Sequence, residues 1–197
     1  MAKKQTKLEL TWIGKDQRPR LEPRILIEDT EKSYHAAHRV SEGDIFDNRL
    51  IFGDNLLALK ALEQEFTGKI KCIYIDPPYN TGSAFGAYED GIEHSLWLSM
   101  MRNRLELLCS LLSCDGAIFV QLDDNEYAHC RVMMDEVFGR ENFITTVVWE
   151  KSFSPRNNAV FFSTSHDFLI VYAKDKSQAS LNLLPRGEQQ NSRYKNP

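Results

Sequence analysis

Four consecutive residues, Asp76-Pro77-Pro78-Tyr79, combine side-chain types that could act together on a weakly nucleophilic amine. The exocyclic amine of a nucleobase is such a group, because its lone pair is delocalised into the ring. A carboxylate and a rigidly aimed backbone carbonyl can each accept one of its two protons and favour the pyramidal, reactive form. We expect Asp76 to supply the carboxylate and Pro77 the carbonyl. The Tyr79 ring can stack on the base, which is worth roughly 1–3 kcal/mol and partly offsets the cost of flipping a base out of a duplex.

The motif follows an apolar run, residues 70–75, that is typical of a strand buried on both faces, as in a parallel sheet flanked by helices. Two prolines end a strand, because proline cannot donate to the ladder and fixes its own φ. In open α/β sheets, ligands bind beyond the carboxyl ends of the strands. Asp76 and Tyr79 are therefore predicted to face a binding crevice. The plainer alternative is that the four residues only end the strand as a stiff turn.

Apolar periodicity predicts the elements around the motif. After a cap at Asp54 or Asn55, leucines three to four residues apart predict a helix that stops at Gly68. With a short strand at 50–52, this helix would form a strand-helix-strand unit over residues 50–76 with a right-handed crossover. The pattern predicts further elements at these places: a helix from near Ser95 through Leu112, a helix through Cys130 that stops at Gly139, and strands at 117–122, 143–149 and 168–173.

Two other segments near the motif could bear on function. The glycine-rich stretch 80–91 is interpreted as a mobile loop that could act as a lid. The strand at 117–122 is followed by an acidic group, Asp123, Asp124, Asn125 and Glu126. Paired carboxylates could bind a metal or serve as acid and base, but an acidic first turn also stabilises the next helix through its dipole. We favour the capping interpretation.

Composition indicates an ordinary soluble globular protein of about one domain, with 197 residues, 42% hydrophobic and 26% charged. No apolar run approaches the roughly 18 residues of a spanning helix, and the start lacks the apolar core of a signal peptide, so we expect a cytoplasmic protein without a membrane partner. The four cysteines lack a Cys-x-x-Cys spacing and are interpreted as reduced, buried thiols. The five histidines show no paired metal spacing, so no metal is expected.

The net charge of −4 is unevenly distributed. Residues 1–24 hold seven basic against three acidic residues, and residues 174–197 hold five against two, which leaves −11 for the middle of the chain. An acidic middle is a poor platform for phosphate backbones. Any binding of nucleic acid must therefore come from local basic patches or from segments outside this chain.

The run Asp76-Pro77-Pro78-Tyr79-Asn80 resembles the catalytic motif of amino-methylating DNA methyltransferases that use S-adenosylmethionine, in the aspartate form usual for adenine. The resemblance implies a Rossmann-like α/β methyltransferase fold, incomplete in this chain, and methyl transfer to N6 of an adenine flipped out of double-stranded DNA. It makes Asp76, Pro77, Pro78 and Tyr79 the catalytic group. It also implies contacts of Asp54 and Asp76 with the cofactor and of Asn80 with DNA.

Residues 10–15, 20–24 and 123–126 further resemble the modification (Mod) subunit of type III restriction-modification systems. This resemblance implies three partners: double-stranded DNA, a restriction (Res) subunit and a second modification subunit. It also makes the loop after Trp149 part of the target-base pocket. Lys151, Phe153 and Arg156 are then candidate base or phosphate contacts, although a solvated loop between two strands explains the same residues equally well.

The sequence departs from this family in one respect. The family binds its cofactor largely through a Phe-x-Gly-x-Gly turn, and here no two glycines stand two residues apart. We therefore expect the amino-terminal part of a longer enzyme: an extension and linker over 1–48, the catalytic part over 49–175, and the start of a target-recognition region or a disordered tail over 176–197. Two other functions stay open, a catalytically inert fragment that binds DNA or a partner, and methylation of cytosine at N4.

Overall fold

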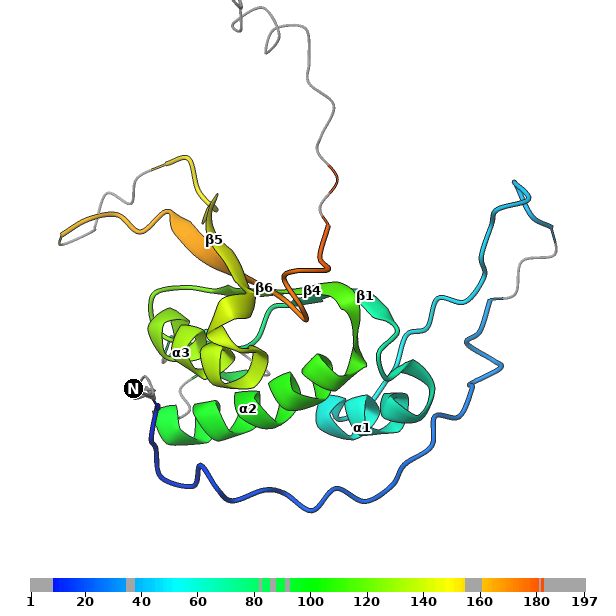
Figure 1. Ribbon diagram of the computed structural model, residues 1–197, viewed down its shortest axis with the longest axis horizontal. Helices are drawn as coiled ribbons and strands as arrows, with labels where there is room; N and C mark the ends of the chain where they lie inside the picture. The colour runs from blue at the N-terminus through cyan, green and yellow to red at the C-terminus, as the bar shows by residue number, and fades with distance from the viewer. Residues whose placement is uncertain are drawn as a thin grey trace, which may run out of the picture.

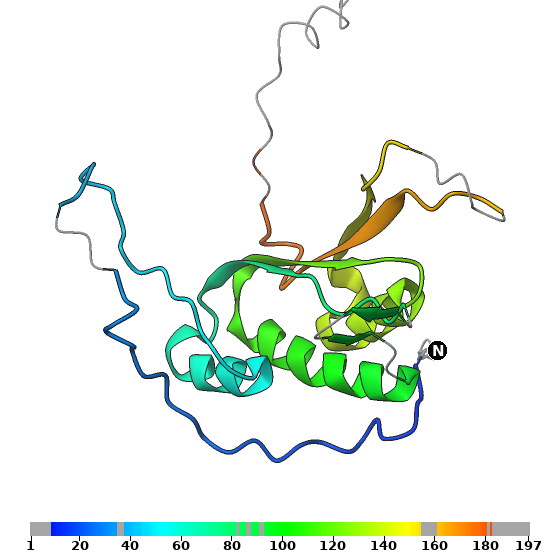
Figure 2. The same ribbon diagram turned by 180° about the vertical axis from the view of Figure 1, so that it is seen from behind.

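A computed structural model describes residues 9–34, 38–81, 83–85, 88–90, 93–154, 161–180 and 182. In this part of the chain, a four-stranded sheet carries three α-helices on one of its faces, as two opposite views agree (Figure 1, Figure 2). The strands stand in the order β1-β4-β6-β5. They are β1 (Ile70–Ile75), β4 (Leu112–Leu122), β5 (Phe143–Glu150) and β6 (His166–Ala173).

The sheet is mixed rather than wholly parallel. Strands β1 and β4 run parallel and are joined through the long helix α2 (His94–Leu111). Strand β6 pairs antiparallel with both β4 and β5. The predicted α/β class is confirmed, and so is the prediction that the last two strands are neighbours. The sequence pattern also predicted a parallel sheet, but only the β1–β4 pair of the described sheet is parallel.

Local sequence signals account for the helix ends. The Asp54 carboxylate accepts hydrogen bonds from the N–H groups of Leu56 and Leu57 at 3.0 and 3.1 Å, which confirms the predicted cap of α1 (Asn55–Phe66). Gly139, with φ of 86°, ends α3 (Tyr127–Phe138), and a 3₁₀ turn, η1 (Arg140–Asn142), follows. Leu112 was expected at the end of α2 but is the first residue of β4.

No helix in the described ranges is both long and apolar enough to cross a membrane.

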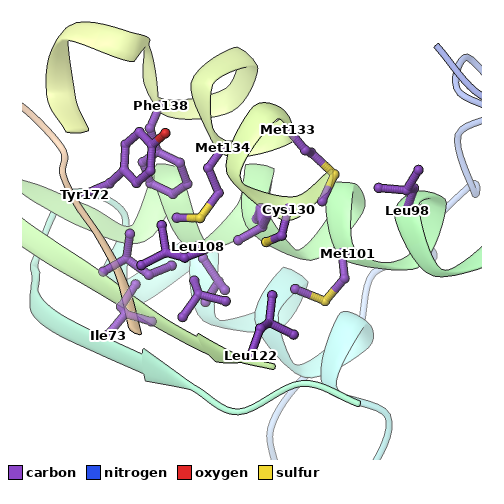
Figure 3. Packing of buried hydrophobic residues seen from close by; sticks show 14 of the residues in the cluster. Ile73, Leu98, Met101, Leu108, Leu122, Cys130, Met133, Met134, Phe138 and Tyr172 are labelled. Atoms are coloured by element: carbon purple, nitrogen blue, oxygen red, sulfur yellow. The ribbon is translucent and has the colours of Figure 1, made fainter. Parts of the chain in front are cut away.

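The core lies between the sheet and the helices α2 and α3. Figure 3 shows Met134 and Phe138 of α3 close to Tyr172 of β6, with Leu108 of α2 beside them. Trp97 of α2 is fully buried as well. Each such side chain contributes roughly 1.5–3 kcal/mol when removed from water, so the apolar stripe predicted for α2 attaches that helix to the sheet.

The first predicted strand-helix-strand unit does not form. Residues 50–52 are not a strand, and the side chains of Leu50 and Phe52 are fully exposed. No described strand pairs with residues 50–52, so no ladder hydrogen bonds offset the entropy of ordering them. β1 is therefore an edge strand of the described sheet, and Tyr74 is exposed although β1 was predicted to be buried on both faces. The parallel unit is β1-α2-β4 instead.

The stretch 80–91, predicted to be a mobile loop, contains a β-hairpin. Its strands are β2 (Ser83–Phe85) and β3 (Tyr88–Asp90), which pair antiparallel. Residues 86 and 87, which connect them, lie outside the described residues. A loop of this composition can pair with itself because each half offers three residues with extended backbone. The lid function stays a prediction.

The amino-terminal segment follows the outer side of α2 (Figure 1). Trp12 donates from Nε1 to Ser99 Oγ at 2.8 Å, and Arg18 donates to Glu106 at 2.7 Å. The buried Lys15 ammonium lies 3.0 Å from Glu136 of α3. These contacts attach residues 9–18 to the helical layer. Residues 25–34 and 38–46 make a wide excursion away from it (Figure 2), and Arg49 returns to α1, where it pairs with Glu65 at 2.7 Å.

Gly116 of β4 allows the close approach of β1. A Cβ at this position would lie 2.7 Å from the Ile70 carbonyl oxygen and 3.0 Å from a Leu112 methyl carbon. We expect Gly116→Ala to lower the free energy of unfolding by about 1–3 kcal/mol, because overpacking forces backbone shifts. Urea denaturation measures this change. Gly43→Ala is the control, since the nearest atom to its Cβ lies 4.0 Å away, and equal losses would contradict the close approach.

The four cysteines are not all buried, contrary to the sequence prediction. Cys130 is buried, while Cys72 of β1 and Cys114 of β4 are exposed. Burial raises the pKa of the Cys130 thiol to about 12, and the thiolate is the reactive form. We expect an aromatic disulfide reagent to label Cys72 and Cys114 in the native protein but Cys130 only after unfolding, as mapped by mass spectrometry. Native labelling of Cys130 as fast as that of Cys72 would refute this.

Candidate active site

The Asp-Pro-Pro-Tyr motif lines a cleft of about 1200 Å³ where β1 ends. All four of its residues, Asp76 to Tyr79, contribute to the wall, which is the place predicted from the strand and the two prolines. Asp54, at the start of α1, lines the same cleft, and so does Lys151, directly after β5. The fold thus brings together six of the nine residues that the sequence analysis assigned to catalysis, cofactor contact or DNA contact.

The backbone of the motif is held in place by a buried side chain. Trp97 of α2 donates from Nε1 to the Pro78 carbonyl oxygen at 2.8 Å. Proline fixes its own φ, so Pro77 and Pro78 leave little freedom between the end of β1 and this hydrogen bond. The motif is therefore presented to the cleft as a rigid turn.

Tyr79 is held through its hydroxyl group. The hydroxyl donates to Asp167 Oδ2 at 3.3 Å and accepts from Gln121 Nε2 at 2.9 Å. Burial, together with the charge of Asp76, raises the pKa of Tyr79 above the ordinary tyrosine value. The phenol is consequently neutral and can keep donating while its ring lines the cleft.

Lys151 forms an ion pair with a carboxylate that the sequence analysis overlooked. Its Nζ lies 2.6 Å from Oδ1 of Asp167, and Asp167 is only 4% exposed. The pair offsets much of the charge that Lys151 was predicted to offer to DNA.

The loop that follows contains the other two candidate base or phosphate contacts, Phe153 and Arg156. Phe153 is 91% exposed, outside the cleft wall, and Arg156 lies outside the described residues.

The end of the cleft near α1 contains a partly buried cation, Arg104, whose side chain is 18% exposed. Arg104 donates to Asn55 Oδ1 at 2.7 Å and to the Met100 carbonyl at 2.9 Å, and its Nη2 lies 4.0 Å from Asp54 Oδ2. Burial lowers the pKa of Arg104, and the nearby Asp54 partly counteracts this. The apolar side chains of Leu59 and Met101 line the same cleft.

The acidic group after β4 does not cap α3 as we had favoured. Glu126 stands at the N-cap position, but its side chain makes no capping hydrogen bond. It is fully buried and accepts a hydrogen bond from the Asn80 amide at 2.6 Å. The carboxylate therefore bonds to Asn80 and not to the N–H groups at the start of α3. Asp123 instead lines the cleft, where burial raises the pKa of its carboxyl group.

Sequence reasoning missed the residues that hold the motif from other elements. Gln121 and Asp167 meet because β4 and β6 pair antiparallel, with Leu122 opposite Phe168, and periodicity does not reveal such a register. One signal was available, since Gln121 is the polar residue in the otherwise apolar run 117–122. An isolated polar side chain at the end of a buried strand needs a partner.

Comparison with known proteins identifies the family. A protein family described as DNA methylase matches residues 70–196, which is more than half of the chain. The chain therefore belongs to the DNA methylase family. This confirms, at the level of the family, the resemblance read from the motif.

Two curated relatives specify the similarity further. The chain is 39% identical over 171 residues to the probable type III restriction-modification enzyme HindVI Mod subunit of Haemophilus influenzae, an alignment that covers 85% of this chain and 23% of that protein. It is 33% identical over 222 residues to the type III restriction-modification enzyme StyLTI Mod subunit of Salmonella typhimurium, which covers 96% and 33%. The chain thus spans about a quarter to a third of the length of these relatives.

Solved structures also resemble the chain. The crystal structure of the M1.HpyAVI-SAM complex aligns with a TM-score of 0.47 and 18% identity, over 70% of this chain and 60% of the other.

Asp167→Asn keeps the size of the side chain but removes the charge that Lys151 and Tyr79 share. We expect the free energy of unfolding to fall by about 1–3 kcal/mol, because hydrogen bonds to a charged group contribute more than neutral ones. Urea denaturation measures the loss. Asp29→Asn is the matched control, since Asp29 pairs with Lys32 on the open surface. If Asp167→Asn costs no more than the control, the buried pair does not stabilise the site.

Proposed function

We propose that this chain is the catalytic part of an enzyme that transfers a methyl group from S-adenosylmethionine to N6 of an adenine in DNA. One observation carries the proposal: Asp76, Pro77, Pro78 and Tyr79 together line a cleft at the end of β1, in a chain of the DNA methylase family. The catalytic part would run from 49 to 175, since every described helix and strand lies between Asn55 and Ala173.

The chemistry follows from the groups on the cleft wall. The Asp76 carboxylate accepts one proton of the adenine amine and the Pro77 carbonyl accepts the other, so that the nitrogen lone pair is directed out of the ring plane. Tyr79 stacks on the flipped base with its hydroxyl held by Asp167 and Gln121. S-adenosylmethionine, when bound, supplies the electrophilic methyl group. Asp76 then takes the proton that the methylated amine must lose.

The residues of the cleft suit such a cofactor. S-adenosylmethionine combines apolar parts with a charged amino-acid end and a ribose. The apolar wall at Leu59 and Met101 and the charged groups of Arg104 and Asp54 match these parts in kind. We assign Asp54 and Asp76 to cofactor contact. Since the sequence has no Gly-x-Gly turn, cofactor binding within this chain depends on these side chains.

The curated relatives support the wider context of the proposal. They are Mod subunits of type III restriction-modification enzymes, so we propose double-stranded DNA as the substrate, with a restriction (Res) subunit and a second modification subunit as partners. Lys151, Phe153 and Arg156 are proposed to contact DNA. The exposed ring of Phe153 suits stacking on a base, and Lys151 can contact a phosphate if it leaves Asp167.

Asp76→Ala in the full-length protein should lower methyl transfer by at least about 100-fold, because it removes a group that accepts an amine proton in the transition state. Transfer of labelled methyl to DNA measures the rate, and analysis of the methylated nucleoside distinguishes N6-methyladenine from N4-methylcytosine. Asp124→Ala is the matched control, since Asp124 is exposed and outside the cleft wall. Unchanged activity of Asp76→Ala would remove Asp76 from the mechanism.

Titration calorimetry with S-adenosylmethionine complements this experiment. Binding by the chain of 197 residues alone would argue against an inert fragment, and it needs no DNA or partner subunit. No binding, combined with activity of the full-length protein, would assign cofactor binding to segments beyond this chain.

A further inference from the structure

A second buried carboxylate, Glu126, lies directly behind the motif. Its Oε1 accepts a hydrogen bond from Asn80 Nδ2 at 2.6 Å and lies 2.6 Å from His94 Nδ1. Its Oε2 lies 3.2 Å from His129 Nδ1. Glu126 thereby connects the end of the motif with the start of α2 and the start of α3.

The surroundings of Glu126 explain how a carboxylate can be fully buried here. A buried carboxylate is unfavourable unless hydrogen bonds and positive charge compensate for lost hydration. The two histidine rings approach each other edge-on, with centroids 5.5 Å apart, and their side chains are 62% and 44% exposed. They cover the solvent side of the carboxylate, while Asn80 occupies the side toward the motif.

Asn80 has an unusual backbone conformation. Its φ is 59°, in the left-handed region that few residues other than glycine adopt and that asparagine tolerates best. This conformation turns the chain immediately after Tyr79. The hydrogen bond to Glu126 fixes the Asn80 side chain in that turn, and the hydrogen bond from Trp97 fixes Pro78. Tyr79 therefore stands between two tethered neighbours.

We propose that Glu126 is a positioning residue for the methyl-transfer site: it holds Asn80, and through Asn80 it keeps Tyr79 and Asp76 in the arrangement that receives the base. His94 and His129 compensate for the burial of its carboxylate. This inference rests on the function proposed above and deepens it. Glu126 does not line the cleft and acts through Asn80.

The same three side chains could in principle ligate a cation, since their ligand atoms lie within 4.8 Å of one another. The geometry favours hydrogen bonding. Two ligands of one tetrahedral zinc ion lie about 3.3 Å apart, given metal-ligand bonds of about 2.0 Å. The separation of 2.6 Å between His94 Nδ1 and Glu126 Oε1 is that of a hydrogen bond.

A double-variant cycle in the full-length protein tests the proposal. Glu126→Ala and Asn80→Ala should each lower kcat at least tenfold, and the variant with both changes should lose no more than the stronger single change, because the two residues act as one unit. Glu126→Gln, which retains an acceptor oxygen for Asn80, should recover part of the lost kcat. Independent, multiplying losses from the two changes, or an unchanged kcat, would overturn the proposal.

A second readout does not depend on activity. The indole N–H of Trp97, assigned by Trp97→Phe, reports on its hydrogen bond to Pro78, so its NMR resonance should shift in Glu126→Ala. The indole of Trp12, bonded to Ser99, is the internal control and should not move. An unmoved Trp97 resonance, or saturable zinc binding that Glu126→Ala abolishes, would overturn the proposal. If the wild-type protein transfers no methyl group, the proposed function fails, while this readout still decides whether Glu126 positions the motif.

Discussion

The site depends on the parallel pairing of β1 with β4. This pairing places Ile75 opposite Val120, so that both strands end at the same edge of the sheet. Asp76 and Gln121 then follow at neighbouring positions, and the hydroxyl of Tyr79 finds Gln121 within hydrogen-bonding distance. Because α2 forms the connection between the two strands, it also brings Trp97 to the motif. The register of β1 against β4 thus fixes the positions of Asp76, of the Tyr79 ring and of the backbone between them.

Two buried carboxylates hold the motif from different directions. Asp167 of β6 reaches Tyr79, and Glu126 at the start of α3 reaches Asn80. Neither would tolerate burial without the polar groups that it binds, so each carboxylate and its partner stabilise one another. For the methyl transfer proposed above, a motif fixed in this way would need little rearrangement when the substrate binds, which is the physical basis of preorganised catalysis.

The sequence alone predicted that the Asp-Pro-Pro-Tyr motif stands at the end of a strand, and it predicted the helices α1 and α3. These predictions follow from local rules, namely proline geometry, an aspartate cap and a 3.6-residue period. It failed where the outcome depends on distant partners. Residues 50–52 have the composition of a strand but pair with no described strand, and Cys72 looks buried in a pattern although β1 is an edge. Likewise, Glu126 resembles a helix cap until Asn80 and the histidines are placed beside it.

The reversed direction of β6 has a consequence for how this fold can vary. Because β6 runs antiparallel to β4, it begins rather than ends at the cleft, and the connection from β5 emerges beside the motif without crossing the sheet. The connection, residues 151–165, can lengthen while its two anchoring strands stay paired. Loop-closure entropy rises only by about 0.6 kcal/mol for each doubling in length. Such a frame can exchange one connecting loop for another at little thermodynamic cost, while the cleft beside it stays unchanged.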